Sequence, residues 1–367
     1  MQNITSIVIT GGPGGGKSGL NGVRQRMEAH GYRVIIVPEI ASEFFISGLT
    51  IGPNGLSNQR FQQAILQEQI NREEHYKQLA AEIPGAKKLV IFDRGVMDGK
   101  AYMREREFVH MIHEMKYRIA QLRDERYAGI FHLESAAVGA KEWYTTANNP
   151  ARKETPAQAA AKDMQTRQAW VGHPHLRIIK SSPDFNIKMQ QLVLAIERLF
   201  GIPEPLEIEK KFLVKLRDIS EFMHASHAVP VNIEQVYLKK KKNARERIRK
   251  RSQDGYSIYY RSQKERIGPG INREIEARMD ESLYKILLKY ERDRSRDIIR
   301  KKRYCFLYDS QYFELDIVKN PKRHKGLALM ELELDDMDQA LHLPPYVEVI
   351  RDVTNDIQFT NSSLAKK

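Results

Sequence analysis

Short apolar runs alternate with amphipathic stretches in the first half of the chain. The runs, which have the length and composition of buried strands, are Ile4–Thr10, Arg33–Val37, Lys88–Phe92, Tyr127–Leu133 and Leu176–Ile179. The stretches with a helical pattern are Leu20–His30, Leu56–Ala81, Arg104–Asp124 and Phe185–Phe200. Strands that alternate with helices predict an α/β domain with a doubly wound parallel sheet. In such a sheet, ligands bind beyond the carboxyl ends of the strands.

After Pro203 and Pro205 the pattern changes to strands in which charged and apolar residues alternate. Residues two apart on a strand point to the same face, so the charged positions of Leu206–Lys211 share one face. The same spacing recurs in Ala244–Arg251, Tyr256–Lys264, Asn272–Met279, Ile298–Phe306, Tyr312–Val318 and Leu329–Leu334. A helix is expected over Asp280–Tyr290.

The opposite faces of these strands are apolar, at Leu206, Ile208, Phe212, Ile275, Leu315, Ile317, Leu332 and Leu334. One charged pair alone is explained more simply as the solvated face of an antiparallel sheet. Eight such strands can instead close into a barrel whose interior alternates with its exterior. Buried charges are costly unless they pair or hold metal, so a charged interior would be wet and filled with ions. We therefore predict an α+β domain with an eight-stranded antiparallel β tunnel.

A glycine-rich segment, GGPGGGKS, follows the first apolar run and satisfies the pattern G-x-x-x-x-G-K-[ST]. Glycines let the backbone wrap phosphates closely, the lysine neutralises the outer phosphates and the serine hydroxyl is placed for Mg²⁺. The segment therefore predicts an ATP or GTP site. Its nucleotide-binding residues are Gly11, Gly14, Gly16, Lys17 and Ser18, and Ser18 is also a metal candidate.

Acidic residues follow two of the predicted strands, Glu39 after the second and Asp93 after the third. An acidic residue at the end of an apolar strand is where a P-loop protein orients Mg²⁺ or its water, so both are candidate catalytic residues. An ordinary loop acid remains an alternative for Glu39. The polar segment Glu142–Trp170 is interpreted as a lid whose cations Arg152, Lys153 and Arg167 close over the phosphates. A solvated helical excursion explains each single cation equally well.

Four motifs together carry a resemblance over roughly Met1 to Gly201: GGPGGGKS, V-P-E at Val37–Glu39, D-R-G-x-x-D at Asp93–Asp98, and T-R-Q-A-W near Arg167. They resemble the AAA-type P-loop domain related to nicotinamide-riboside kinases, and V-P-E and D-R-G also resemble deoxynucleoside kinases. The resemblance implies that Glu39 accepts the proton of an acceptor hydroxyl and that Arg94 clamps phosphate or acceptor. The acceptor is not identified, and plain nucleoside triphosphate hydrolysis stays open.

The E-x-E-x-K start at Glu207 and the later acidic and basic pairs, with the ending Val347–Thr354, resemble the CYTH domain of triphosphate tunnel metalloenzymes. The resemblance covers roughly Pro205 to Ala365 and implies an eight-stranded antiparallel tunnel that binds a triphosphate with divalent metal. The phosphate-binding residues it implies are Lys211, Arg247, Arg249, Lys264, Lys301 and Arg303. The metal-binding residues it implies are Glu207, Glu209, Glu274, Glu276, Glu314, Asp316, Glu331 and Glu333. We expect Glu207, Glu209 and Lys211 to be catalytic.

A triphosphate with bound metals needs cations for its oxygens and carboxylates for the metals in one cavity. Hard oxygen ligands favour Mg²⁺ or Mn²⁺ over zinc. A bound metal can also lower the pKa of a water for in-line attack on the terminal phosphorus.

The chain carries a net charge of +13, which is compatible with nucleic acid, anionic membrane or polyphosphate ligands. Solvated lysines beside a basic tunnel explain the run Lys239–Lys242 more simply than nucleic-acid contacts do, because no stacking aromatics are interleaved with it. No apolar run approaches the roughly 20 residues that a membrane span needs. The single cysteine, Cys305, excludes an internal disulfide, and Met1–Thr5 lacks the form of a signal peptide, so we expect a cytoplasmic protein.

The sequence thus predicts a two-domain phosphoanhydride enzyme: a P-loop domain over 1–201, a linker over 202–205 and a tunnel domain over 206–367. The tunnel is expected to hydrolyse tripolyphosphate or a nucleoside triphosphate, and the P-loop domain to phosphorylate a small acceptor. One alternative is a nucleotidyl cyclase in the tunnel. A second is a kinase whose tunnel only senses polyphosphate. A third is a nucleic-acid-binding switch gated by ATP. The oligomeric state stays open.

Overall fold

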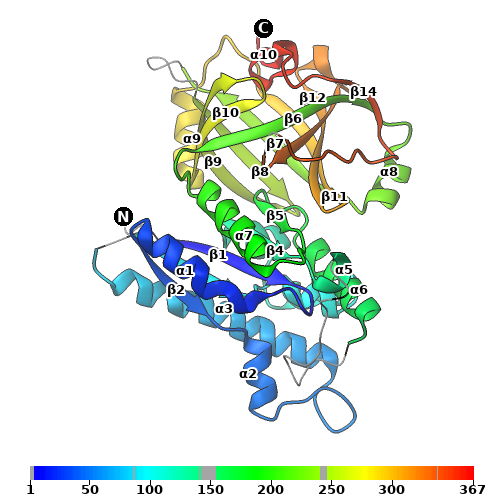
Figure 1. The fold of residues 1–367 in the computed structure, drawn as a ribbon. Helices are drawn as coiled ribbons and strands as arrows, with labels where there is room; N and C mark the ends of the chain where they lie inside the picture. Colours follow the sequence, from blue (N-terminus) through cyan, green and yellow to red (C-terminus); the bar gives the residue numbers. More distant parts are fainter. Residues whose placement is uncertain (1–3, 86, 140–141, 143–153, 240–245, 337) are drawn as a thin grey trace. The chain divides into compact units, whose positions relative to one another are not determined.

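The computed structural model describes residues 4–85, 87–139, 142, 154–239, 246–336 and 338–367. Their contacts divide the chain into two compact units, Met1–Glu197 and Arg198–Lys367, and both are drawn in Figure 1. None of the described helices combines the length and the apolar character needed to cross a membrane.

The N-terminal unit is built on a five-stranded parallel sheet with the strand order β2-β3-β1-β4-β5. The strands are β1 (Ile4–Gly11), β2 (Tyr32–Val37), β3 (Lys87–Asp93), β4 (Gly129–Leu133) and β5 (Leu176–Ile179). Ile7–Ile9 of β1 and Leu89–Phe92 of β3 are fully buried, as strands covered on both faces must be. The predicted doubly wound α/β sheet is confirmed.

Helices connect these strands (Figure 1). They are α1 (Leu20–Ala29), α2 (Ile40–Ile46), α3 (Asn58–Glu82), α4 (Glu105–Glu114), α5 (Ala136–Gly139), α6 (Pro156–Ala169) and α7 (Phe185–Leu199). The continuous helix predicted over Arg104–Asp124 is wrong. Helix α4 stops at Glu114 because Lys116 adopts a φ of 63°, in the left-handed region that ends helices.

The C-terminal unit is an antiparallel sheet with the strand order β10-β9-β8-β7-β11-β12-β13-β6-β14, closed into an eight-stranded barrel by pairing of β10 with β6. Its strands are β6 (Leu206–Lys215), β7 (Val229–Tyr237), β8 (Glu246–Gln253), β9 (Tyr256–Gly268), β10 (Ile271–Met279), β11 (Ile299–Tyr308), β12 (Gln311–Asn320), β13 (Ala328–Leu334) and β14 (Glu348–Asp352). The predicted antiparallel β tunnel is confirmed. Strand β7 was not predicted, and β14 pairs with β6 outside the closed ring.

Two helices cover the outside of the barrel, α8 (Ile219–Ser226) and α9 (Glu281–Tyr290). Phe222 of α8 packs edge-on against Phe306, and Tyr284 of α9 packs against Tyr259. The outer face is not covered everywhere: Leu206 is 41% exposed and Ile275 is 56% exposed. Two of the outward apolar residues named in the sequence analysis are therefore open to solvent.

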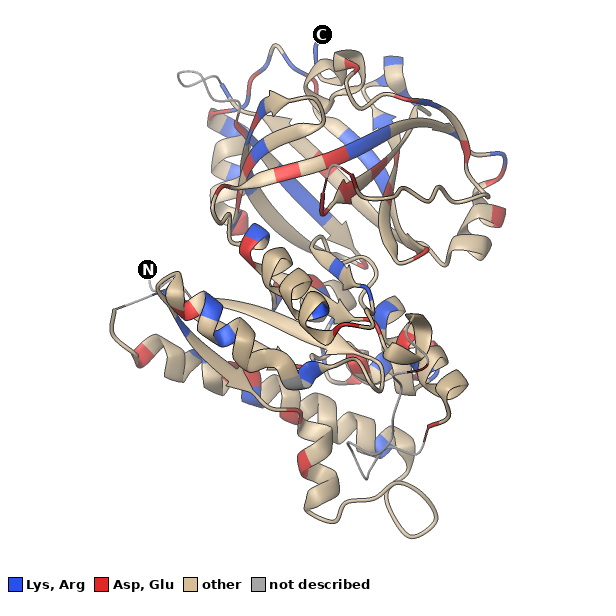
Figure 2. Ribbon diagram, viewed as in Figure 1, with Lys and Arg blue, Asp and Glu red and all other residues tan. Residues whose placement is uncertain are grey.

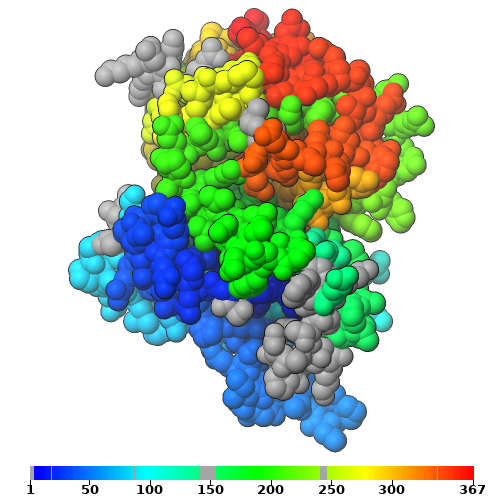
Figure 3. All heavy atoms as spheres, viewed as in Figure 1, coloured from blue at the N-terminus to red at the C-terminus, as the bar shows by residue number. Residues whose placement is uncertain are grey.

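The C-terminal segment packs onto one end of the barrel. Helix α10 (Asn361–Leu364) places Leu364, followed by Ala365, in a buried cluster with Tyr237, Val318 and Leu329. Figure 3 shows this segment in red, lying against the barrel strands.

Candidate functional site

The glycine-rich loop stands at the carboxyl end of β1, as the sequence predicts. Gly11 ends the strand, and Gly14 and Gly16 have φ values of 79° and 87°, a region that glycine occupies without penalty. Lys17 begins a short 3-10 turn that leads into α1. The predicted metal ligand, the Ser18 hydroxyl, lies outside the described part of the chain.

Asp163 of α6 anchors the loop, and its carboxylate is fully buried. Its Oδ1 accepts hydrogen bonds from the backbone N–H of Gly12 (3.0 Å) and of Ser135 (2.9 Å) and lies 3.0 Å from Nε2 of His132. A Cβ at Gly12 would lie 2.7 Å from the Asp163 Cβ, so only glycine fits there. The sequence does not single out Asp163, because an acid inside an alanine-rich helix is typical of a solvated face.

A buried lysine, Lys188 of α7, supports the same loop from another direction. Its Nζ donates to the carbonyl oxygens of Gly15 (2.7 Å) and Glu134 (2.6 Å). Burial lowers the pKa of Lys188 to about 8. This residue was also missed, since a single lysine in an amphipathic helix carries no motif.

The predicted acids and cations of the N-terminal unit do converge at the carboxyl ends of the strands. Lys17 forms an ion pair with Asp93 and lies 3.8 Å from Glu39, while Nε of Arg94 donates to Glu39. Burial acts to raise the pKa of Glu39, but the charges of Arg94 and Lys17 outweigh it and lower that pKa to about 2. For Asp93, burial prevails over the attraction of Lys17 and the pKa is raised. The cluster therefore contains one carboxylate held ionised and one that protonates more readily.

Asp98, the second acid of the D-R-G-x-x-D motif, is a buried anchor. It accepts hydrogen bonds from Oγ1 of Thr10 (2.8 and 2.9 Å to its two oxygens), from Nε1 of Trp170 (2.7 Å) and from the backbone N–H of Gly95 (3.3 Å). It thereby ties β1 to the T-R-Q-A-W segment.

The segment interpreted as a lid is described only from residue 154 onward, and Arg152 and Lys153 lie outside the described residues. The described part is helix α6, whose Ala159 and Thr166 are buried, so this part packs into the unit. Arg167 lies 3.4 Å from a carboxylate oxygen of Glu134. Ser181 donates a hydrogen bond to the Glu134 carboxylate, and Lys188, which supports the loop, donates to the Glu134 carbonyl oxygen. Arg167 therefore lies close to the glycine-rich loop.

In the C-terminal unit, ion pairs join strands that are not neighbours in the sheet. Arg247 of β8 reaches Glu274 of β10 at 2.6 Å, across β9, and Arg249 pairs with Glu276 over the same span. Side chains can meet in this way only on the concave face of the barrel, since the outer face carries the apolar clusters under α8 and α9. Figure 2 shows the blue and red positions along these strands. The predicted charged face is thus the inside of the tunnel.

One inward cluster gathers three carboxylates around Lys264. Its Nζ forms an ion pair with Glu207 and lies 3.1 Å from Glu209 and 3.5 Å from Glu274. Burial raises the pKa of Glu207 well above its usual range, against the attraction of Lys264, and Glu209 and Glu274 add to the rise. The pKa of Glu274 is held well below its usual range, because the charges of Arg247 and Lys264 outweigh its burial. Glu333 is opposite Glu209 in the register of β13 with β6 and its charge also raises the pKa of Glu207, so it lies on the same face, with its side chain exposed.

A second inward cluster is centred on Arg303 of β11. Its guanidinium makes two 2.8 Å hydrogen bonds to Asp316, pairs with Glu314 and lies 3.2 Å from Glu331. Two lysines complete the cluster: Lys301 pairs with Asp316, and Lys211 lies 3.0 Å from Glu331. Burial acts to raise the pKa of Glu331, but Lys211 and Lys301 outweigh it and hold that pKa well below its usual range. The predicted tunnel residues of these two clusters and of the Arg247 and Arg249 pairs therefore take part in inward ion pairs.

The carboxylates of the Lys264 cluster fit a hard divalent cation. Among the described residues, no three His, Cys, Asp or Glu side chains are arranged around a ready metal position, because a lysine or arginine stands within each carboxylate cluster. The donors are all oxygens, and the Lys264 ammonium among the three carboxylates shows that they converge on a position that holds a cation. Glu207, Glu209 and Glu274 are therefore the residues that would hold Mg²⁺ or Mn²⁺.

Strand β7 and its neighbours contribute inward residues that the sequence analysis missed. Gln235 donates to the hydroxyl of Tyr237 (3.0 Å), and Ser262 accepts a 2.7 Å hydrogen bond from Arg247. The alternation in Val229–Tyr237 is a signal that could have found β7, because the apolar Val229, Val231 and Ile233 alternate there with Pro230, Asn232 and Glu234.

The fold and sites define a class of protein, in which a P-loop α/β unit is joined to a closed antiparallel barrel with a charged interior. A family model described as an AAA domain matches residues 6–187. None of the curated proteins compared matches the chain.

Several solved structures are similar to parts of the chain. The inorganic triphosphatase NE1496 is 28% identical, with a TM-score of 0.31, covering 44% of this chain and 98% of that one. A putative adenylyl cyclase from Hippeastrum, described as having a dominant triphosphatase activity, is 13% identical, with a TM-score of 0.28, covering 35% and 80%. A putative adenylate cyclase from Vibrio parahaemolyticus is 15% identical, with a TM-score of 0.27, covering 36% and 78%.

Proposed function

We propose that the chain is a two-site phosphoanhydride enzyme, in which the barrel is a metal-dependent triphosphatase and the N-terminal unit binds ATP or GTP. The observation that carries this proposal is the set of inward ion pairs that bridge non-neighbouring strands of a closed barrel. Folding does not require so many buried charges, because an apolar core of equal volume would be at least as stable. The presence of these buried charges fits a cavity in which the cations and carboxylates leave their ion pairs and bind a charged ligand instead.

In the proposed reaction, the six tunnel cations bind the oxygens of a linear triphosphate. These cations are Lys211, Arg247, Arg249, Lys264, Lys301 and Arg303. Arginine suits this task because its planar donors match phosphate oxygens in pairs. Glu207, Glu209 and Glu274 would hold the divalent metal, and the remaining acids Glu276, Glu314, Asp316 and Glu331 keep the cations oriented. Mg²⁺ or Mn²⁺, when bound, would supply charge neutralisation and a water of lowered pKa.

At the N-terminal site, Lys17 and the loop glycines would bind the nucleotide phosphates, while Asp93 orients the Mg²⁺ ligand shell. Glu39 is placed to accept a hydrogen bond from the hydroxyl of a small acceptor, and Arg94 holds Glu39 in position. Its low pKa keeps Glu39 ionised throughout the neutral range. The γ-phosphoryl acceptor would therefore be a neutral hydroxyl compound.

The test is a phosphate-release screen of tripolyphosphate, ATP and GTP with Mg²⁺ or Mn²⁺. Wild type, Lys17→Ala and the double variant Glu207→Ala/Glu209→Ala are compared. We expect Lys17→Ala to retain tripolyphosphate hydrolysis and the double variant to lose it by at least about 100-fold, because each variant removes one site only.

Product analysis distinguishes the competing functions. Cyclic nucleotide with pyrophosphate would identify a cyclase. Unchanged turnover in the double variant would mean that the tunnel is only a sensor. Binding of 5′-triphosphate RNA that falls steeply with salt would identify a nucleic-acid switch.

A further inference from the structure

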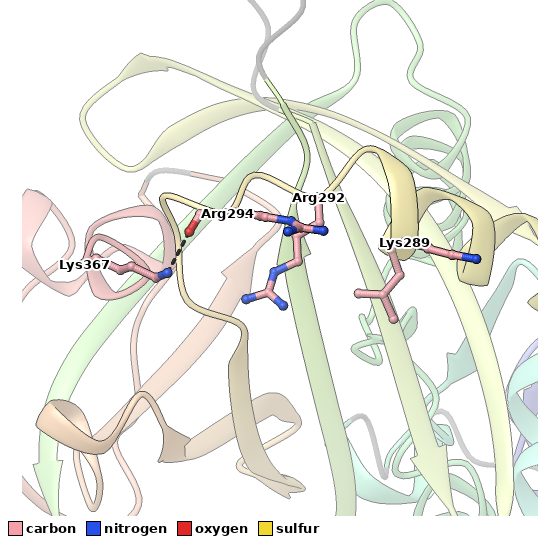
Figure 4. A pocket seen from close by; sticks show the side chains of 5 residues that line it. Lys289, Arg292, Arg294 and Lys367 are labelled. Carbon is pink, nitrogen blue, oxygen red and sulfur yellow. Dashed lines mark hydrogen bonds between the residues drawn. The ribbon is translucent and has the colours of Figure 1, made fainter.

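A pocket of about 400 Å³ lies in the C-terminal unit, at the end of α9 and the turn that follows it. Figure 4 shows its lining from close by. The lining residues are Leu288, Lys289, Arg292, Arg294 and Lys367. Four of the five are cations, and no Asp or Glu is among them. None of the five belongs to the tunnel clusters described above.

Within the described part of the chain, neither arginine of the pocket has a partner for its guanidinium group. Figure 4 shows Arg292 and Arg294 in the centre of the view, both among the lining residues, with the ammonium of Lys289 directed away. No described residue pairs with either guanidinium, and Nε of Arg292 is buried without a hydrogen bond. Lys367 is anchored at the rim, because its Nζ donates to the carbonyl oxygen of Arg294 at 2.7 Å.

Two carboxylates of this part of the chain are already engaged elsewhere. Asp293 accepts hydrogen bonds from the backbone and hydroxyl of Ser295 and lies 3.4 Å from Arg296. Glu281, at the start of α9, pairs with Lys285 at 2.9 Å. Among the described residues, no carboxylate forms an ion pair with either guanidinium, and a buried donor such as the Nε–H of Arg292 is costly to leave without an acceptor.

We propose that this pocket binds a small phosphoryl anion, inorganic phosphate or pyrophosphate. A bound anion would satisfy the Arg292 N–H and neutralise both guanidiniums, and the forked donors of paired arginines match the tetrahedral oxygens of phosphate. The site stands on its own geometry, and its ligand is the class of anion that a phosphoanhydride hydrolase releases.

The observations favour a small anion over a nucleic-acid strand. A strand requires a track of cations and free aromatic faces on which its bases stack. Tyr290, the exposed aromatic residue beside the pocket, carries the Lys289 ammonium 5.0 Å from its ring centroid. The pocket is concave and two arginines line its centre, which favours the binding of one small ligand.

The experiment is isothermal titration of the full chain with inorganic phosphate and with pyrophosphate, in EDTA. Wild type is compared with Arg292→Gln, Arg294→Gln and the control Lys285→Gln. Lys285 lies on α9, the helix whose end borders the pocket, and Lys285→Gln removes the same charge. Lys285 is not a lining residue and is already paired with Glu281. We expect Arg292→Gln and Arg294→Gln each to weaken one binding event at least tenfold, while Lys285→Gln matches wild type. Comparison of the affinities for phosphate and for pyrophosphate identifies which anion the site prefers.

Arg294 is exposed, so Arg294→Gln should fold normally even if Arg292→Gln does not. Tripolyphosphate hydrolysis is measured in parallel and should be unchanged in Arg294→Gln, which separates this proposal from the proposed function. Equal binding in Arg294→Gln and wild type would overturn the proposal. An equal loss of anion binding in Lys285→Gln would also overturn it. So would the finding that single-stranded RNA binds in a way that depends on Arg294 while neither anion binds.

Discussion

The carboxylate of Asp163 ties three segments of the N-terminal unit to one another: the glycine-rich loop, the turn after β4 and β4 itself. All of its bonds go to a single oxygen, Oδ1, while Oδ2 is buried without a hydrogen bond. The nucleotide is expected on the opposite side of the loop. Asp163 would therefore shape the loop without touching the ligand.

This placement gives a prediction with a matched pair of variants. Asp163→Ala leaves the N–H groups of Gly12 and Ser135 buried without acceptors, so the free energy of unfolding should fall by about 3 kcal/mol. ATP affinity should fall with it, because the loop loses its backbone geometry. Asp163→Asn retains an oxygen acceptor and should lose about 1 kcal/mol. Denaturant unfolding and ATP titration measure both effects, and equal losses in the two variants would contradict this role for Oδ1.

Lys188 gives a prediction about pH. Its folded-state pKa of about 8 lies below that of an unfolded lysine, about 10.4. Between these values the unfolded chain binds the additional proton, so stability rises as pH rises through this window and is lost as pH falls toward 8. The full change is about 3 kcal/mol. Urea unfolding at several pH values should show this rise in wild type and in Lys180→Met, an exposed-lysine control, but not in Lys188→Met. Parallel curves for wild type and Lys188→Met would exclude the assignment.

At the residue scale, motif spacing was sufficient to predict which charged residues lie together at the carboxyl ends of the strands. Lys17, Asp93, Glu39 and Arg94 occupy fixed offsets from strand ends, and the structure brings them together. Asp163 and the other supporting residues act across gaps of more than 100 residues, so no local pattern marks them. Long-range support of this kind is specified by packing rather than by spacing.

Strand β6 is the element on which the barrel closes. One of its edges pairs with β13, and the other is shared between β10 at its start and β14 at its end. The turn between β9 and β10 reinforces the closure, because the carbonyl of Gly270 accepts a 2.9 Å hydrogen bond from the N–H of Glu209. The geometry of this turn therefore bears directly on a proposed metal ligand.

Two turn glycines test the closure. Gly270 has a φ of 66°, and a Cβ there would lie 3.1 Å from the carbonyl oxygen of Glu209 and 3.1 Å from a methyl of Thr354. Gly255, in the turn between β8 and β9, has a φ of 78° and open space around it. Both alanine variants carry the left-handed strain, so Gly270→Ala should be less stable than Gly255→Ala by about 1 kcal/mol from crowding alone. It should also slow tripolyphosphate hydrolysis, whereas Gly255→Ala should not. Equal stability and equal activity of the two variants would mean that the β9–β10 turn accommodates the added methyl group without displacing Glu209.

Charge alternation was the signal that predicted most of the barrel, and its limits explain the missed strand. On β7 the inward residues Val231, Ile233, Gln235 and Tyr237 carry no charge, so the acidic and basic pairs that mark its neighbours are missing. The helix over Arg104–Asp124 failed for a different reason. Helical periodicity continues in the sequence, but one left-handed residue, Lys116, interrupts the backbone.

For the whole molecule, the sequence predicted two phosphate-handling units because each has its own motif and its own periodicity. The structure adds that each unit has its own hydrophobic core. The buried residues of β1–β5 form the core of the N-terminal unit, and three apolar clusters around the barrel form that of the C-terminal unit. Separate cores predict separate unfolding transitions, since a core is the usual unit of cooperativity.

Ligands should then shift these transitions independently. A ligand at about 100 times its dissociation constant stabilises its site by about 2.7 kcal/mol, which corresponds to roughly 5 to 10 °C for a unit of this size. In a calorimetric scan with Mg²⁺ and non-hydrolysable analogues of ATP and tripolyphosphate, wild type should show two raised transitions. Lys17→Ala should lose the rise of one transition only, and Glu207→Ala/Glu209→Ala the rise of the other only. A single transition in wild type, or a variant that abolishes both rises, would show that the two units unfold and bind as one.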